Sequence, residues 1–250
     1  MDSRGKATGQ GALTAELLND YILTCGASNF ADEADLQLMS DTATLPPKIL
    51  LTFDDGLLSQ FQTAKPVLDK FGIKAFWFVY TKTFRDDFDI SEITNYIAAR
   101  FFSSFDHFFA AFSENIRSID KHYETKEFEH YRSSIQSKFP FYSVSDVKFR
   151  FCRNRILNHE EFRDAADKLL DCLGLTVDDV AKRIWMSLDH LKKLNSEGHK
   201  IGLHSHSHPY NLGELSFVEQ TNELTENFGI LKEALDVEPS AISYPLGSFN

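Results

Sequence analysis

The chain has 250 residues, of which 42% are hydrophobic and 25% are charged. Both values are close to the globular average, which excludes a disordered, collagen-like or low-complexity chain. The 37 Asp and Glu residues outnumber the 26 Lys and Arg residues, giving a formal charge of −11, so we expect no nucleic-acid partner. Glycine-rich phosphate-binding motifs are missing, and this excludes the common nucleotide-dependent enzymes.

Cysteine usage and apolar runs indicate where such a chain resides. Cys25, Cys152 and Cys172 are widely spaced, which is typical of reduced thiols and gives no cysteine-based zinc site. The first residues lack the apolar core of a signal peptide, and no apolar run approaches the roughly 20 residues that span a bilayer. We therefore expect no transmembrane segment and a cytoplasmic location.

The first half of the chain begins with a weakly patterned N-terminal extension, residues 1–45. After Pro46-Pro47, the apolar run at 48–53 predicts a buried strand. Apolar residues at helical spacing predict a helix over 60–71, and residues 74–80 form a second apolar, aromatic run. A strand, a helix and a strand joined by short links predict parallel pairing.

Residues 84–185 break this alternation and are predicted to form a helical, Phe-rich insertion. Phenylalanines recur at helical spacing over 101–112, and this stripe is interpreted as core packing. Further helices are predicted over 160–173 and 176–195.

The alternation of strands and helices then returns. A strand is predicted at 200–203, a helix at 214–235 and a strand at 241–244. The fold class is therefore α/β, with four parallel strands over residues 46–83 and 186–250 and the helical insertion between them.

Three polar clusters each follow a predicted strand directly: Asp54 and Asp55, the histidines of 204–208, and the turn 245–247. The carboxyl ends of parallel strands share one rim, so we expect the clusters to converge. Two imidazoles and a carboxylate, with a second carboxylate beside them, are typical of a catalytic zinc-type site with a general base. The same ligands also describe a non-haem Fe(II) site, although the βα pattern opposes the β-sandwich that usually holds one.

The motifs resemble those of the polysaccharide deacetylase family, also called the NodB-homology domain or carbohydrate esterase family four. Residues 52–56 (TFDDG) resemble its first motif, and residues 198–209 (GHKIGLHSHSHP) resemble the second. Residues 243–247 (SYPLG) resemble a variant of the third. The resemblance covers about 48–81 and 186–250, and it implies a distorted (β/α) barrel that four strands leave incomplete.

The resemblance also implies roles for single residues. Asp54 is the expected general base, and a divalent metal is held by Asp55, His204 and His208. The metal is expected to be Zn²⁺, with Co²⁺, Ni²⁺, Mn²⁺ and Fe²⁺ as alternatives. The remaining site residues are expected from the third motif: Leu246, whose backbone N–H would bind the oxyanion, and Tyr244, Pro245 and Gly247, which would contact substrate.

Two departures from the family pattern follow. Ser243 stands where the family often has an arginine that pairs with the base. No histidine matches the general acid of the later family motifs, so we expect a fragment, or a fold completed by the insertion and a partner chain. The expected function is metal-dependent removal of N-acetyl groups from an amino sugar of a glycan or glycan precursor. The alternatives are hydrolysis of another non-peptide C–N amide, or a truncated protein that binds metal without activity.

Overall fold

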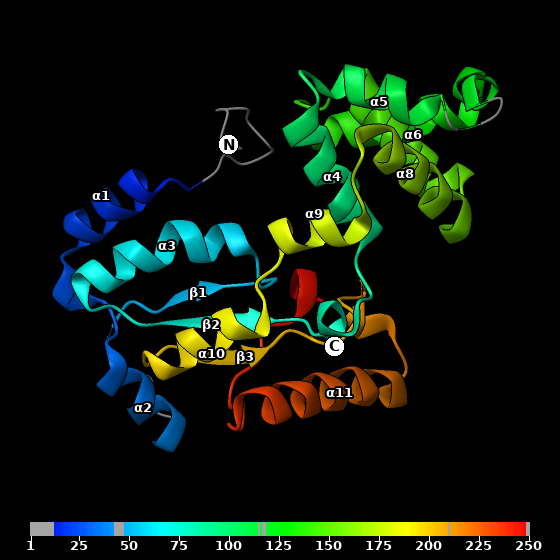
Figure 1. The fold of residues 1–250 in the computed structure, drawn as a ribbon. Coiled ribbons are helices and arrows are strands. Elements are labelled where there is room, and N and C mark those ends of the chain that lie inside the picture. The colour runs from blue at the N-terminus through cyan, green and yellow to red at the C-terminus, as the bar shows by residue number, and fades with distance from the viewer. Residues whose placement is uncertain (1–12, 43–47, 115, 117–118, 210, 249–250) are drawn as a thin grey trace. The chain divides into compact units, whose positions relative to one another are not determined.

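The structure is a computed structural model that describes residues 13–42, 48–114, 116, 119–209 and 211–248. The chain divides into two compact units, one made of residues 13–88 and 182–250 and the other centred on residues 89–181 (Figure 1). The expected domain start at residue 46 and the Pro46-Pro47 pair lie outside the described residues. None of the helices in the described ranges combines the length and apolarity needed to cross a membrane.

A parallel sheet is the centre of the first unit. Within the described residues it has three strands in the order β1-β2-β3: β1 (Leu51–Phe53), β2 (Ala75–Val79) and β3 (Lys200–Leu203). Phe53 lies opposite Trp77, and Val79 lies opposite Leu203. The strands therefore end close to one edge of the sheet, and the expected parallel arrangement is confirmed for three of the four strands.

The fourth expected strand, residues 241–244, is not a strand in the structure. The segment makes one parallel bridge, between Leu203 and Ile242, with two backbone hydrogen bonds of 2.9 Å on β3. The chain then enters a 3₁₀ turn, η6 (Pro245–Gly247), where proline offers no N–H to a ladder. In the described residues the sheet thus remains open and does not close into a barrel.

Five α-helices accompany the sheet in this unit: α1 (Ala15–Cys25), α2 (Glu33–Thr42), α3 (Leu58–Phe71), α10 (Leu188–Ser196) and α11 (Phe217–Leu235). Short 3₁₀ turns join them: η1 (Ala27–Asn29), η2 (Lys82–Arg85) and η5 (Leu212–Glu214). The first two helices lie in the segment expected as a weakly patterned extension. Leu18 and Ile22 of α1 are buried in the core of the unit, because they share one face of that helix.

Strand β2 is buried on both faces. Ala75, Trp77 and Val79 join a core built with α1, α3, α10 and α11. Phe76 and Phe78 point to the opposite face, where they join a smaller cluster with α2. Packing on both sides fixes the end of this strand, next to which the functional residues lie.

The second unit is helical. Its elements are α4 (Ile90–Phe101), α5 (Phe105–Ser113), η3 (Ile119–Glu124), α6 (Lys126–Lys138), α7 (Val144–Phe151), η4 (Cys152–Ile156) and α8 (His159–Leu173), and α9 (Val177–Ile184) begins in it. Phe108, Phe112 and Phe149 are fully buried, with ring centroids 5.2–5.8 Å apart. The interpretation of the Phe stripe as core packing agrees with this arrangement.

Two predicted helices are each divided in the structure. The stripe over 101–112 breaks after α4, because the side chain of Ser104 caps the start of α5 by accepting from the N–H of His107. The helix expected over 176–195 is two helices, α9 and α10. Ser187 caps the second of them through its contact with His190.

Candidate metal centre

The turn after β1 places the first carboxylates. Asp55 and Gly56 both adopt left-handed backbone conformations, with φ of 72° and 63°. The positive φ favours glycine at position 56, and a Cβ there would lie in tight contact with Val79, 3.0 Å from its Cγ1. Gln60 donates from Nε2 to the carbonyl of Asp54 at 2.9 Å and holds the turn against α3.

The loop after β3 places the histidines. Ser205 and His208 have positive φ values of 62° and 57°, and the hydroxyl of Ser205 accepts the N–H of His208 at 3.1 Å. The chain therefore folds back on itself in one turn. The rings of His204 and His208 lie 5.1 Å apart between centroids.

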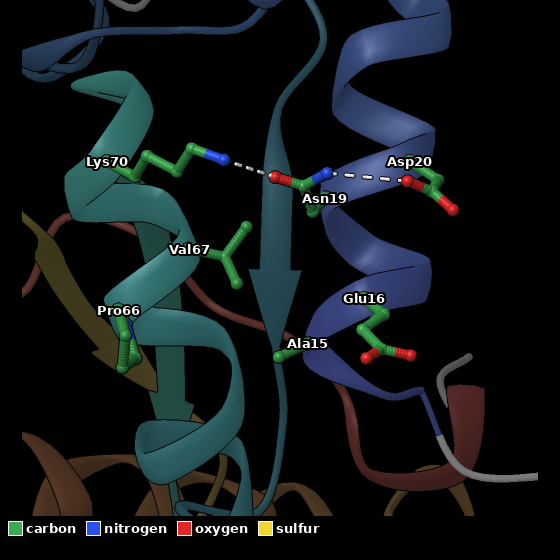
Figure 2. A pocket seen from close by; sticks show the side chains of 7 residues that line it. All are labelled: Ala15, Glu16, Asn19, Asp20, Pro66, Val67 and Lys70. Carbon is green, nitrogen blue, oxygen red and sulfur yellow. Dashed lines mark hydrogen bonds between the residues drawn. The ribbon is translucent and has the colours of Figure 1, made fainter.

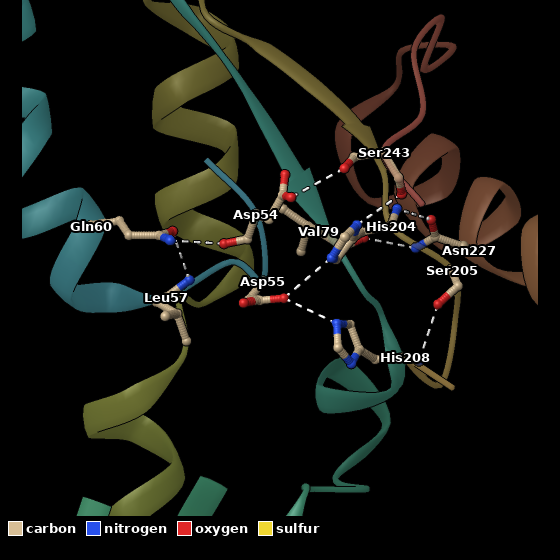
Figure 3. Close-up of polar contacts among 10 residues, drawn as sticks. All are labelled: Asp54, Asp55, Leu57, Gln60, Val79, His204, Ser205, His208, Asn227 and Ser243. Carbon is tan, nitrogen blue, oxygen red and sulfur yellow. Dashed lines mark hydrogen bonds and ion pairs between the residues drawn. The ribbon is translucent and has the colours of Figure 1, made fainter. Parts of the chain in front are cut away.

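The two segments meet at the carboxylate of Asp55, as Figure 3 shows. Its Oδ1 lies 3.2 Å from Nε2 of His204 and 3.2 Å from Nε2 of His208. The three potential ligand atoms all lie within 4.8 Å of one another. Ligands at Zn–N and Zn–O distances are about 3.3–3.5 Å apart in a tetrahedral site, so these residues fit a divalent cation.

The tautomer of His204 supports this fit. Its Nδ1 lies 2.8 Å from the carbonyl oxygen of Ser243. A carbonyl only accepts hydrogen bonds, so Nδ1 carries the proton in the neutral ring and the lone pair of Nε2 faces Asp55. A lone pair and a carboxylate 3.2 Å apart need a proton or a cation between them. A backbone carbonyl on the far ring nitrogen is also the usual partner of a metal-bound histidine.

The pKa values of Asp55 and His204 shift in opposite directions. Burial alone would raise the pKa of Asp55, but the hydrogen bonds and charges of His204 and His208 outweigh it and hold the pKa below its usual range. Burial alone would lower the pKa of His204, but its bonds to Asp55 and the Ser243 carbonyl outweigh it and raise the pKa. Cation binding here therefore competes with protonation of His204.

The second carboxylate, Asp54, has a hydrogen-bond partner at one of its two oxygens and none at the other among the described residues. Ser243 donates from Oγ to Oδ2 at 3.1 Å. Oδ1 is buried and has no hydrogen-bond partner among the described residues. A buried acceptor of this kind needs a donor such as a water molecule, and the chemistry of the site offers Asp54 as a proton acceptor beside Asp55.

The third predicted cluster lies in η6. Leu246 has a φ of 53°, and its side chain is exposed, as is that of Tyr244, whereas Pro245 is buried. Gly247 has a φ of 66° and ends the turn. The turn follows Ser243, which contacts both Asp54 and His204, so the structure brings this segment to the same edge. The roles of these four residues toward a substrate stay a prediction.

A family model described as polysaccharide deacetylase matches residues 171–250. Over this segment the chain is similar to that family. The match includes His204, His208 and the turn at 245–247, so the resemblance stated from the motifs is confirmed. The TFDDG motif at 52–56 lies outside the matched residues. A comparison with curated protein sequences found no significant match.

Three solved structures are similar to the chain. The Streptococcus pyogenes deacetylase PplD in complex with acetate is 16% identical, with a TM-score of 0.51, over 100% of this chain and 70% of that one. IcaB from Ammonifex degensii is 16% identical, with a TM-score of 0.48, over 98% and 72%. The BpsB deacetylase domain from Bordetella bronchiseptica is 15% identical, with a TM-score of 0.48, over 100% and 76%. Of these three similarities, the first is close enough to indicate a shared fold.

Sequence reasoning missed a supporting residue in the matched segment. Asn227 of α11 is fully buried; its Oδ1 accepts the N–H of His204 at 2.9 Å. Its Nδ2 donates to the carbonyl of Val79 at 2.9 Å and to Oγ1 of Thr81 at 3.1 Å. Asn227 therefore ties the ends of β2 and β3 together. The sequence signal that could have revealed this role is a polar residue at helical spacing from Ile230 and Leu231, both of which are buried in α11.

His206 is not among the three candidate ligands and contacts Thr81 and Glu226 instead. Its Nδ1 lies 3.0 Å from Oγ1 of Thr81, and its Nε2 lies 3.4 Å from Oε1 of Glu226. A shallow groove between α1 and α3, shown in Figure 2, shares no lining residue with the centre. The candidate chemistry is thus concentrated at the strand ends.

Proposed function

We propose that the chain is a metal-dependent hydrolase that removes N-acetyl groups from an amino sugar of a glycan or glycan precursor. The observation that carries the proposal is the meeting of Asp55, His204 and His208 at one carboxylate oxygen, with Asp54 beside them. The match of residues 171–250 to the polysaccharide deacetylase family model supports the substrate class. The structurally similar PplD holds acetate, which is the second product of such a reaction.

A divalent cation held by Asp55, His204 and His208 would polarise the amide carbonyl and make a water molecule more acidic. Zn²⁺ suits a tetrahedral site that includes one carboxylate and two imidazoles. Co²⁺, Ni²⁺, Mn²⁺ and Fe²⁺ can bind the same ligands but have less preference for the tetrahedral geometry.

The chain's own residues supply the proton transfer and the positioning. Asp54 accepts the proton of the attacking water through Oδ1, which has no hydrogen-bond partner among the described residues. Ser243 holds the other carboxylate oxygen, Oδ2, by a hydrogen bond. The N–H of Leu246 is the proposed donor to the oxyanion, and Tyr244, Pro245 and Gly247 form the proposed substrate contacts. Attack on the amide carbon and cleavage of the C–N bond yield acetate and the free amine of the sugar.

Acetate release from N-acetylglucosamine oligomers, measured with increasing Zn²⁺ or Co²⁺, tests the proposal. We expect metal-dependent release from the wild type. Asp54→Asn should lose release by a factor of about a hundred or more while it still binds the metal. Metal binding without acetate release from any oligomer would contradict the proposal. Release of another acid from a non-sugar amide would favour a different C–N hydrolase, and no release from any amide would favour a metal-binding protein without activity.

A further inference from the structure

The loop between the two histidines has a strained backbone. Ser205 and His208 are both left-handed without being glycine. Left-handed backbone is unfavourable for residues other than glycine, because Cβ approaches the following carbonyl oxygen. The conformation therefore persists only because other groups stabilise it.

Glu223 of α11 makes the most extensive contact with this loop. Its Oε2 accepts the N–H of His206 at 2.9 Å and the N–H of Ser207 at 2.7 Å. Its Oε1 accepts the hydroxyl of Ser207 at 2.6 Å. Three donors on one carboxylate are charge-assisted hydrogen bonds, which are about twice as strong as neutral ones.

Other groups hold the ends of the loop. Asn227 accepts the N–H of His204, and the N–H groups of Thr81 and Lys82 donate to the carbonyl of His206 at 3.2 and 3.0 Å. Between the two histidines, the N–H groups of His206 and Ser207 donate to Glu223. Residues four apart on a helix lie on one face, so α11 presents both Glu223 and Asn227 to the loop.

We propose that Glu223 is a positioning residue of the metal centre, which holds the 205–207 loop in the conformation that keeps His208 within ligand distance of Asp55. The inference rests on the proposed metal site. Glu223 acts through the loop backbone and is not itself a ligand. Partners of this kind typically change metal affinity by about 10- to 100-fold when they are removed.

The loop part of the proposal is tested without metal. Amide hydrogen exchange of His206 and Ser207 should be slow in the wild type and at least about tenfold faster in Glu223→Ala, because both N–H groups lose their acceptor. Unchanged exchange in Glu223→Ala would overturn the proposal.

Titration with Zn²⁺ tests the metal part. Glu223→Ala should weaken binding by about 10- to 100-fold, and Glu223→Asp should also weaken it because its carboxylate is one methylene shorter. Glu223→Gln should recover most of the affinity, since its amide oxygen can accept both N–H groups. Glu226→Ala is the matched control on the same helix and should bind like the wild type, because Glu226 contacts the side chain of His206 and not the loop backbone.

The outcomes separate the two proposals. Wild-type affinity in both Glu223→Ala and Glu223→Asp would overturn the role of Glu223 and leave the metal site standing. A wild type that binds no Zn²⁺ would overturn the metal site and this role together. If Glu223→Ala fails to fold, Glu223→Asp and Glu223→Gln decide: equal affinity in the two variants contradicts the positioning role.

Discussion

The hydroxyl of Ser243 donates a hydrogen bond of 3.1 Å to Oδ2 of Asp54. The carbonyl of the same residue accepts from Nδ1 of His204 at 2.8 Å. One residue thus orients both the proposed general base and one proposed metal ligand, through two different groups. The partner is a neutral hydroxyl, so Asp54 gains a hydrogen bond from this position without a neighbouring positive charge.

Ser243→Ala separates these two contacts, because it removes the hydroxyl and keeps the carbonyl. We expect kcat for acetate release to fall about tenfold, the cost of a lost hydrogen bond to a charged group, with Zn²⁺ affinity unchanged. Steady-state kinetics and metal titration check this, with Ser196→Ala, which alters an exposed helix-end hydroxyl, as the control. An unchanged kcat would show that the hydroxyl does not orient the base.

Asn227→Leu should lower the free energy of unfolding by about 2–4 kcal/mol, because it removes the acceptor of the buried His204 N–H and a donor to the Val79 carbonyl. Zn²⁺ affinity should fall as well, since the end of β3 loses its tie to β2. Chemical denaturation and metal titration measure the two effects. Asn222→Leu, an exposed position on the same helix, should change neither. Equal stability of the two variants would contradict the account of Asn227.

Gly202→Ala tests the packing of β3 on β2. A Cβ at this position would lie 2.5 Å from two ring atoms of Phe78 and 3.0 Å from the carbonyl of Ala241. We expect a loss of about 1–3 kcal/mol in the free energy of unfolding. Gly229→Ala is the contrast, because its added Cβ meets nothing within 4 Å on α11 and should stabilise that helix by up to about 1 kcal/mol. Thermal unfolding that ranks the two variants the other way would refute this packing.

The buried His199 makes stability depend on pH. Its Nδ1 accepts the N–H of Ala75 at 3.1 Å, and its Nε2 has no partner among the described residues. Burial, helped by the charges of Lys74 and Lys65, lowers its pKa to about 4 from 6.5. The unfolded chain therefore binds this proton more readily than the folded chain does. The contribution of neutral His199 to the free energy of unfolding is complete above pH 6.5 and is lost as the pH falls toward 4.

The loss in the free energy of unfolding that is due to His199 is about 3 kcal/mol at most, because each pKa unit corresponds to about 1.4 kcal/mol. Urea unfolding of the wild type and His199→Asn at several pH values measures it. Asparagine keeps an acceptor for the Ala75 N–H and does not titrate, so the difference between the two proteins should shrink as the pH falls from 6.5 to 4. A difference that stays constant over this range would exclude His199 as the source.

The elements that sequence reasoning located depend on local patterns. The apolar run at 74–80 predicts β2, and the rule that parallel strands share an edge brings Asp55 toward His204 although 149 positions separate them. The breaks after Phe101 and at Trp185 were missed because apolar residues continue the helical spacing across both. Only serines, Ser104 and Ser187, mark the new helix starts.

The supporting contacts were out of reach for a different reason. The bond between Ser243 and Asp54 joins residues 189 positions apart, and Asn227 reaches Val79 across 148 positions. No local pattern encodes such pairs, because they follow from the exact register of β3 and the rotation of α11. The segment 241–244 was expected as a full strand since a short apolar run looks the same whether it pairs over one residue or four.

Anomalous diffraction at the zinc edge, from crystals grown with one equivalent of Zn²⁺, locates the cation relative to the three proposed ligands. We predict a single strong peak bounded by Oδ1 of Asp55 and the Nε2 atoms of His204 and His208, at about 2.0–2.2 Å from each. A zinc peak elsewhere in the protein, or no peak at all, would contradict the proposed metal site.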